Sequence, residues 1–169
     1  GLSKLLNHQT YKDRFAEEIQ RAKRFQHHMA VLIFDLDKFK RINDTLGHPY
    51  GDYVIQTVAK IMSKNVRTVD VVARYGGEEF AIILINTTAK MAMVVAQRIV
   101  NNIADYPFSM DGSEVTMTIS GGMAEYPTHS EDMKELIKLS DQAMYDAKQK
   151  GGNGILIHGY EENATIVGD

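Results

Sequence analysis

A short turn between two β-prone stretches constrains the fold of this chain more than any other feature. Residues 69–73 and 81–85 are rich in aliphatic residues, and the segment between them reads Arg-Tyr-Gly-Gly-Glu-Glu-Phe. This pattern predicts a β-hairpin with Gly76 and Gly77 at its tip, where glycine can adopt positive φ angles. The tip leaves the backbone open to a phosphate, and one of the two carboxylates that follow, Glu78 or Glu79, can hold a metal cation beside it. A solvent-exposed hairpin with charged residues explains the turn alone equally well.

The length and composition are those of one globular domain. The chain has 169 residues, no cysteine and a formal net charge of −3. A chain of this length can bury a hydrophobic core without disulfides or a structural metal. The lack of cysteine excludes a disulfide framework, a thiolate zinc site and a cysteine nucleophile. Basic residues are scattered along the chain, so nucleic acid is not an expected partner, whereas small phosphorylated ligands need only a few local cations.

No part of this segment is expected to contact a membrane. The longest apolar run, residues 29–34, is far too short to cross a bilayer, and no signal-type segment precedes it. We therefore expect a cytoplasmic location, which the absence of cysteine also favours. Because the chain opens directly on the lead-in to its first helix, we expect that an upstream sensor or partner region has been removed.

An apolar run that ends in two acids predicts the centre of a sheet. Residues 29–36 are almost entirely apolar, and Asp35-Leu36-Asp37 closes the run. A strand that is apolar on both faces is normally buried on both faces. An aspartate at its end needs a cation or several hydrogen bonds, because burying it unpaired costs on the order of several kcal/mol. Alternatively, Asp35 or Asp37 caps the helix that starts near Lys38.

Helical periodicity predicts five helices. They cover residues 2–24 after a short lead-in with Asn7 as N-cap, residues 38–46, residues 54 to about 67, residues 89–104 and residues 131–150. Met91 and Val94 are expected on the apolar side of the fourth helix, as core residues. Residues 47–52 are expected to form a glycine-bounded turn.

The remaining strand signals complete an α+β fold. Residues 115–120 alternate as a strand that Gly121-Gly122 is expected to break, residues 155–157 predict an edge strand, and residues 161–169 a polar tail. The order of elements predicts a ferredoxin-like core, with a mixed sheet of about five strands flanked by helices. In this topology the strand at 29–36 and the hairpin can be neighbours, so Asp35 and Glu78 could meet at one edge of the sheet.

Two blocks of the sequence resemble one known family. Residues 76–80, Gly-Gly-Glu-Glu-Phe, are the GGEEF form of the GGDEF signature of diguanylate cyclases, and residues 34–52, FDLDKFKRINDTLGHPYGD, resemble the family's FDxDxFKxxND…GHxxGD block. The resemblance covers nearly the whole chain and assigns residues 1–160 to a GGDEF catalytic domain. It implies the palm fold of nucleotide cyclases and the synthesis of cyclic di-GMP from two GTP molecules. Each domain would hold one GTP, so turnover would need a homodimer.

The resemblance also implies a metal site and catalytic residues. Asp35, the backbone carbonyl of Leu36 and Glu78 would hold Mg²⁺, for which Mn²⁺ could substitute, since hard oxygen ligands suit these cations. Glu78 matches the family's metal ligand and proton acceptor. Glu79 would share the proton transfer or be a salt-bridged strand residue. Lys40 would stabilise charge that develops on the phosphates.

The substrate-binding residues follow from the same two blocks and from the last helix. Asn43 and Asp52 match the pair that reads guanine, and a carboxylate can accept from both N1–H and the 2-amino group, which can discriminate against the wrong base by about 10⁴. Backbone amides near Phe39 and the ammonium group of Lys148 would hold the triphosphate. His48 matches a position beside the substrate, although a structural role would equally explain a lone histidine here.

An Arg-x-x-Asp sequence, Arg67 to Asp70, stands before the hairpin at the spacing of the family's inhibitory product site. Arg98 resembles the secondary arginine of that site. The resemblance therefore implies feedback inhibition by cyclic di-GMP, with the planar guanidinium gripping guanine or a phosphate. Taken alone, such a pair is usually a surface ion pair worth about 0–1 kcal/mol.

The chain departs from the family pattern at three places. The family's opening D-x-L-T-G-L and N-R-R read Gly1-Leu2-Ser3-Lys4-Leu5 and Asn7-His8-Gln9 here, and its late G-R-N reads Gly151-Gly152-Asn153. An arginine expected on the triphosphate is thus replaced by Gly152, which suggests weaker GTP binding.

Three other readings compete with an active diguanylate cyclase. The first is a catalytically weak or inactive receptor that binds cyclic di-GMP through its Arg-x-x-Asp site. The second is a purely dimerising interaction module, and the third is a mixed-dinucleotide synthase. The active enzyme is favoured because an active site that no longer catalyses a reaction is free to lose its polar residues. This chain retains the set Asp35, Lys40, Asn43, Asp52 and Glu78.

Overall fold

A computed structural model describes residues 5–160 of the chain. The departure from the family pattern at residues 1–4 and the predicted tail at 161–169 lie outside these described residues. Within them, the order of elements agrees with the predicted α+β fold and adds one small hairpin, β4–β5.

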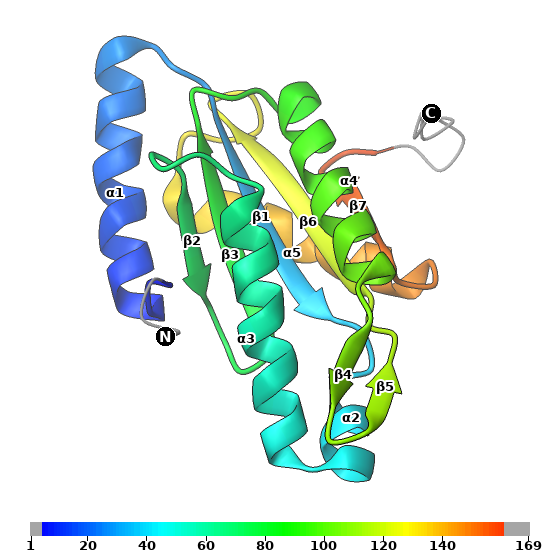
Figure 1. The fold of residues 1–169 in the computed structure, drawn as a ribbon. Helices are drawn as coiled ribbons and strands as arrows, with labels where there is room; N and C mark the ends of the chain where they lie inside the picture. The colour runs from blue at the N-terminus through cyan, green and yellow to red at the C-terminus, as the bar shows by residue number, and fades with distance from the viewer. Residues whose placement is uncertain (1–4, 161–169) are drawn as a thin grey trace.

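A central five-stranded sheet has the order β2-β3-β1-β6-β7 (Figure 1). Its strands are β1 (Met29–Leu36), β2 (Val71–Arg74), β3 (Glu79–Ile85), β6 (Ile119–Tyr126) and β7 (Gly154–Ile157). Strand β1 pairs antiparallel with both β3 and β6, whereas β7 is parallel to β6. The sheet is therefore mixed, and the prediction that β1 lies at its centre, beside the hairpin β2–β3, is confirmed.

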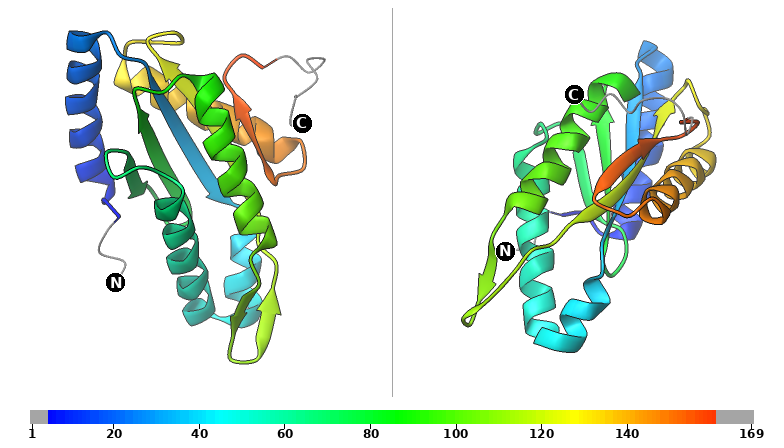
Figure 2. Two further views of the ribbon diagram at one scale, coloured as in Figure 1. Left: turned by 45° about the horizontal axis from the view of Figure 1, so that its top comes forward. Right: turned by 90° about the vertical axis from the view of Figure 1, so that its right-hand side faces the viewer.

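Helices cover both faces of the sheet. They are α1 (His8–Phe25), α2 (Phe39–Leu46), α3 (His48–Lys64), α4 (Ala89–Asp105) and α5 (Met133–Gln149). Figures 1 and 2 show α3 and α4 on one face, and α1 and α5 on the other. No helix within residues 5–160 is both long and apolar enough to span a membrane.

Double-sided burial explains the unbroken apolar run of β1. Leu32 and Phe34 belong to the core on the α3–α4 face, whereas Val31 and Ile33 belong to the core on the α1–α5 face, and all four are fully buried. Removing apolar surface from water is the main favourable term in folding, so the two cores fix this strand in the middle of the sheet.

Two helix starts bear on the predictions. Helix α1 begins at His8, and the predicted N-cap Asn7 accepts a hydrogen bond from the Thr10 N–H at 2.8 Å. The predicted turn at 47–52 is wrong, because α3 begins at His48 and contains Asp52. Pro49 suits a first helical turn, where its missing N–H is no loss and its φ is already helical. Helix α3 also ends at Lys64, earlier than predicted.

The prediction that Gly121-Gly122 breaks a strand is also wrong. Strand β6 runs through both glycines. Glycine is needed at these two positions because neighbouring groups approach too closely for a side chain. A Cβ on Gly121 would lie 2.6 Å from the Phe34 ring, and one on Gly122 would lie 2.0 Å from the backbone oxygen of Ser140 in α5. The glycines thus allow β1 and α5 to pack against β6.

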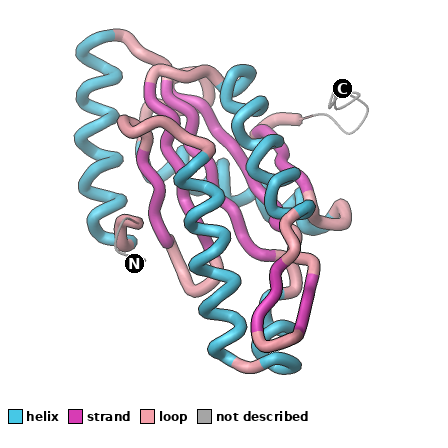
Figure 3. The backbone as a smooth tube through the Cα atoms, in the orientation of Figure 1, coloured by secondary structure: helices cyan, strands magenta, loops and turns pink. Residues whose placement is uncertain are grey.

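The stretch before β6 forms a separate hairpin that the sequence did not predict. Strands β4 (Phe108–Met110) and β5 (Ser113–Val115) pair with each other only. Figure 3 shows this hairpin projecting beyond the central sheet, near α2 and α3. The Tyr50 hydroxyl of α3 donates to the Phe108 and Ser113 carbonyl oxygens at 3.1 and 2.8 Å and fastens the hairpin to α3.

Helix α4 matches its predicted range, but two of its apolar residues do not face the core. Met91 and Val94 are 59% and 66% exposed, so their assignment as core residues is wrong. Ala92, Ala96 and Ile99 fill the buried face instead.

Candidate active site

The end of β1 and the tip of the β2–β3 hairpin lie side by side. Asp35 is directly opposite Glu79 in the antiparallel register, and the Leu36 N–H donates to the Glu78 carbonyl at 3.2 Å. Lys38 then takes a φ of +57° and serves as N-cap of α2 without a side-chain cap. The alternative that Asp35 or Asp37 caps this helix is therefore wrong, and both carboxylates are left for other partners.

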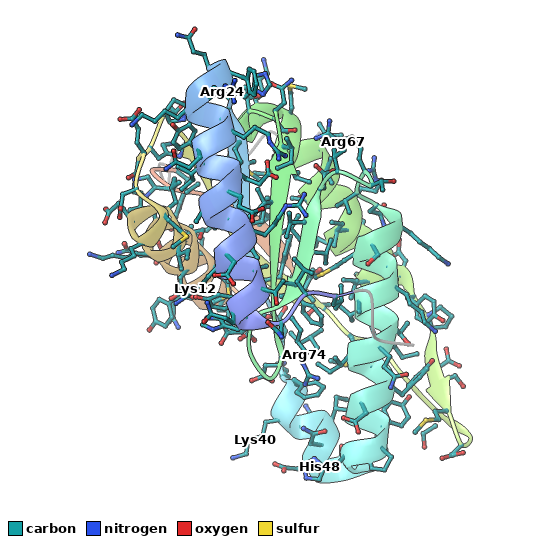
Figure 4. The ribbon with its side chains drawn as sticks, turned by 90° about the vertical axis from the view of Figure 1, so that its left-hand side faces the viewer. Lys12, Arg24, Lys40, His48, Arg67 and Arg74 are labelled. Atoms are coloured by element: carbon teal, nitrogen blue, oxygen red, sulfur yellow. The ribbon has the colours of Figure 1, made fainter. Side chains whose placement is uncertain are left out.

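A cavity of about 480 Å³ opens between this edge of the sheet and the helices α2 and α3. Its walls are formed by the residues Phe39, Lys40, Asn43, His48, Asp52, Arg74, Gly77, Glu78 and Glu79. All except Arg74 and Gly77 are predicted catalytic or substrate-binding residues. The volume lies in the usual range for small-molecule sites. The structure thus gathers the two sequence blocks around one cavity, and Figure 4 shows Lys40 and His48 at this end of the molecule.

The hairpin tip presents backbone to the cavity. The N–H groups of Tyr75 and Gly76 both donate to the Glu79 carbonyl, at 2.8 and 3.2 Å. A Cβ on Gly77 would meet nothing within 4 Å, so this glycine leaves open space beside the backbone, as predicted. The expected positive φ angles are wrong: neither Gly76 nor Gly77 adopts one.

Arg74 is a cavity residue that the sequence analysis missed. Its guanidinium donates to the Gly77 carbonyl from Nη2 at 2.7 Å and from Nε at 3.1 Å. These two bonds tie the end of β2 to the hairpin tip. The available signal was its position, because an arginine that ends a strand directly before a glycine turn can reach back over that turn.

Gly51 positions the part of the cavity that contains Asn43 and Asp52. A Cβ at Gly51 would lie 2.0 Å from the Asn43 Oδ1 and 3.1 Å from the Phe39 ring. Only glycine lets α3 pack this closely against α2 at that point. From the sequence, Gly51 is predicted only as a turn residue, because a linear pattern does not show that α2 lies against it.

The acids at the sheet edge share one electrostatic environment. Burial raises the pKa of Asp35, opposed by the Lys148 ammonium beside it and reinforced by the charge of Asp37. Burial, followed by the charge of Asp35, also raises the pKa values of Glu78 and Glu79. Among the ion pairs found within residues 5–160, none involves Glu79, so the described residues give no support to the salt-bridge role.

The residues Asp35, Leu36 and Glu78 supply the oxygen donors that suit Mg²⁺. The Lys148 ammonium already lies 3.0 Å from the Asp35 Oδ1 and 3.5 Å from the Leu36 carbonyl, so this edge attracts a cation. Within residues 5–160 no three His, Cys, Asp or Glu side chains gather as a metal site. The predicted set has only two carboxylates and a carbonyl, and Mg²⁺ commonly completes such a set with water and substrate phosphates.

Lys148 and Asp37 lie behind this edge as a pair. The Lys148 Nζ is 3.1 Å from the Asp37 Oδ1, and Lys148 is not among the cavity-lining residues. Burial tends to raise the pKa of Asp37, but hydrogen bonds from Ser120, Thr118 and the Asn153 N–H outweigh it, so this pKa is lowered. The sequence predicts that an aspartate at the end of this strand needs a cation or several hydrogen bonds, but it does not name the partners of Asp37.

The Arg-x-x-Asp residues form a compact pair far from the cavity. Arg67 donates to both Asp70 oxygens, at 2.9 and 3.2 Å, and the Ile85 N–H donates to the Asp70 Oδ1 at 3.0 Å. The Asp70 side chain is 1% exposed and that of Arg67 is 57% exposed. Arg98 donates to the side chain and the carbonyl of Asn65, both at 2.8 Å. Figure 4 shows Arg67 at the opposite end of the molecule from Lys40 and His48.

Comparison with known proteins identifies relatives over most of the chain. Residues 1–154 match the family described as "Diguanylate cyclase, GGDEF domain". Diguanylate cyclase A of Treponema denticola is 42% identical over 129 residues, which are 76% of this chain and 35% of that protein. The chain spans about a third of the length of the curated relatives it matches.

Solved structures show the same fold. The GGDEF domain of TpbB (YfiN) from Pseudomonas aeruginosa superimposes with a TM-score of 0.89 at 33% identity, over 94% of this chain and 92% of that one. The GGDEF domain of DgcB from Caulobacter crescentus, solved in complex with c-di-GMP, gives a TM-score of 0.88 at 28% identity, over 95% of each chain. With the match to residues 1–154, the cavity and the shared fold in agreement, this chain belongs to the GGDEF domain family of diguanylate cyclases.

Proposed function

We propose that this chain is the catalytic domain of a diguanylate cyclase, which condenses two GTP molecules into cyclic di-GMP and two pyrophosphates. One observation carries the proposal: a single cavity is lined by Asn43 and Asp52 from one sequence block and by Gly77, Glu78 and Glu79 from the other. Nucleotidyl transfer requires groups that recognise the base, acids that can hold a metal or accept a proton, and backbone that a phosphate can approach. The use of GTP is consistent with a cytoplasmic domain.

The cavity residues divide between the two ends of the nucleotide. Asn43 and Asp52 would hold guanine, with the Asp52 carboxylate accepting from N1–H and the 2-amino group. Lys40 and the backbone amides near Phe39 would hold the triphosphate, together with Lys148, which does not line the cavity; His48 would lie beside the substrate. A site that binds both ends fixes the α-phosphate for attack.

The acids at the sheet edge would serve the reacting atoms. Asp35, the Leu36 carbonyl and Glu78 would hold Mg²⁺ or Mn²⁺, which when bound neutralises phosphate charge and lowers the pKa of the attacking 3′-hydroxyl. Glu78 would accept the proton of that hydroxyl. Glu79, the next residue in the chain, would share the proton transfer.

The proposal is tested with concentrated protein, GTP and Mg²⁺, with products identified by mass. Cyclic di-GMP is expected from the wild type, and Glu78→Gln should lower turnover by at least about 10³, since it removes both a metal ligand and the proton acceptor. Glu17→Gln is the matched control, because Glu17 is exposed on α1 and far along the chain from the cavity residues. Its turnover should equal that of the wild type.

The same assay separates the competing functions. Product from Glu78→Gln at the wild-type rate would contradict the assignment of the catalytic acid. A wild-type protein that makes no product even when dimerised artificially, yet binds cyclic di-GMP, would be a receptor instead of an enzyme.

We also propose that Arg67, Asp70 and Arg98 bind cyclic di-GMP as a feedback inhibitor. The exposed Arg67 guanidinium is held in one orientation by the buried Asp70, which favours binding of a guanine or phosphate without further ordering. The distance of this site from the cavity would make the inhibition allosteric.

Arg67→Ala tests the inhibitory site. Added cyclic di-GMP should inhibit the wild type, and the concentration that halves activity should rise at least about tenfold in the variant, because a charge-assisted contact is lost. Activity without added product should stay close to that of the wild type. Arg24→Ala, an exposed arginine on α1, serves as the control. Equal inhibition of both variants would contradict the site.

A further inference from the structure

We propose that Asp37 is a positioning residue that holds Lys148 and the turn after α5 in place for the triphosphate of GTP. This inference rests on the function proposed above and adds to it a residue with no contact to the substrate. The Asp37 carboxylate contacts four residues in three segments of the chain: the start of β6, helix α5 and the turn before β7.

The Asp37 carboxylate is saturated with donors. Its Oδ1 accepts from the Ser120 hydroxyl at 2.7 Å and from Lys148 at 3.1 Å, and its Oδ2 accepts from the Thr118 hydroxyl at 2.7 Å and from the Asn153 N–H at 2.9 Å. An ionised carboxylate has about four acceptor positions, so all of them are filled. Asp37 therefore has no oxygen position left for a metal, unlike Asp35, and its role is to hold other groups.

The turn after α5 closes over this carboxylate. Gly152 has a φ of +74°, and a Cβ there would lie 2.8 Å from the Asp37 Oδ2. The absence of a side chain at residue 152 lets the backbone N–H of Asn153 reach Asp37. The end of α5, which carries Lys148, and the start of β7 are thus fixed to the end of β1.

Lys148 is shared between two acids with different roles. Its Nζ lies 3.0 Å from Asp35 and 3.1 Å from Asp37. A cation bound by Asp35 would repel the Lys148 ammonium group. Asp37 would still bind that ammonium group, because the hydrogen bonds from Ser120, Thr118 and Asn153 fix the Asp37 carboxylate in place. Asp37 would then orient Lys148 toward the phosphates that accompany the metal.

The test is direct binding of 3′-deoxy-GTP with Mg²⁺, measured by calorimetry, because this analogue lacks the attacking hydroxyl and is not consumed. Guanosine, which has no phosphates, is the second ligand. Asp37→Asn and Lys148→Met should each weaken binding of 3′-deoxy-GTP about tenfold and leave guanosine binding unchanged, as expected for the loss of one charge-assisted contact at the phosphates. The double variant should be no weaker than either single variant, because Asp37 acts through Lys148. Asp105→Asn, an exposed acid at the end of α4, is the control.

Each outcome decides the inference. Equal weakening of guanosine binding would show a merely structural role, and additive losses in the double variant would show that Asp37 does not act through Lys148. If the wild type and Asp37→Asn bind 3′-deoxy-GTP equally, this inference alone fails. If the wild type binds neither ligand, the proposed function fails with it. If Asp37→Asn does not fold, Thr118→Val can be used instead, because it removes one of the hydrogen bonds to Asp37. It should weaken binding of 3′-deoxy-GTP by a smaller factor and leave guanosine binding unchanged. An unchanged affinity for 3′-deoxy-GTP would overturn the inference.

Discussion

At the scale of single residues, Gly152 connects a departure from the family pattern to a contact in the structure. The family's arginine is absent at this position, and the glycine that replaces it has a positive φ and packs against Asp37. Any side chain here would meet both backbone strain and the Asp37 carboxylate. The missing guanidinium and the added Cβ therefore have to be tested separately.

Two substitutions at this residue make that separation. Gly152→Ala and Gly152→Arg should both lower the melting temperature, since a Cβ at positive φ costs about 1–2 kcal/mol. If the missing arginine weakens GTP binding, Gly152→Arg should have a lower KM for GTP than Gly152→Ala, because only it adds a cation for the phosphates. Equal KM values for the two variants would contradict the hypothesis of weakened binding.

At the scale of elements, Glu125 joins segments at the end of the sheet where β6 finishes. Its carboxylate accepts from the first backbone N–H of α4, at Ala89, and contacts His28 at 2.8 Å; it also accepts from the Thr128 hydroxyl. The Glu125 N–H in turn donates to the His129 Nδ1 at 2.8 Å. The start of β1, the start of α4 and the turn after β6 thus depend on one buried side chain.

The pKa directions at this network predict acid sensitivity. Burial tends to raise the pKa of Glu125, but hydrogen bonds from Thr128, Ala89 and His28 outweigh it and lower this pKa. Burial, with the nearby His158, lowers the pKa of His129. Both groups bind fewer protons in the folded than in the unfolded state, so their stabilising contributions are lost as the pH falls. For His129 the loss begins below the ordinary histidine value, and for Glu125 below the ordinary glutamate value.

Glu125→Gln tests this network by thermal unfolding across pH. At pH 7 the variant should be less stable by about 1–3 kcal/mol, because hydrogen bonds to a buried charged group are weakened. The difference from the wild type should shrink as the pH falls below the ordinary glutamate value, since the unfolded wild-type chain takes up a proton there before the folded carboxylate does. Glu17→Gln should show no such difference at any pH, and a gap that stays constant down to pH 4 would contradict the role assigned to the ionised carboxylate.

At the scale of the whole molecule, the proposed site would hold one GTP in each domain, whereas the proposed product joins two nucleotides. We therefore expect turnover to require two domains that face each other, each with its own GTP. Activity per domain should rise with protein concentration and approach a plateau when the dimer is saturated. Assays over a dilution series, with gel filtration at the same concentrations, check this expectation. Activity per domain that stays flat while the protein is monomeric would contradict it.

Much of this architecture could be predicted because it is encoded locally. The continuous apolar run of β1 identified the central strand, since only a strand covered on both faces can be apolar on both. The two-glycine turn identified the hairpin, and Asn7 marked the start of α1. The two motif blocks contain eight of the nine cavity residues, all except Arg74, because each block is a short continuous stretch that the family resemblance picks out.

Long-range packing decided the rest, and a linear pattern does not show which segments will approach one another. Gly121 and Gly122 resemble a strand break until Phe34 and the backbone of α5 are placed against them. Residues 118, 120, 148 and 153 meet at Asp37 only because β1, β6, α5 and β7 converge there. The sequence alone determined the central strand, the hairpin and most of the residues that line the cavity, because each depends on neighbours in the chain. The tertiary structure alone decided which groups hold those residues in position, because hydrogen bonds and close contacts form between segments that the sequence separates.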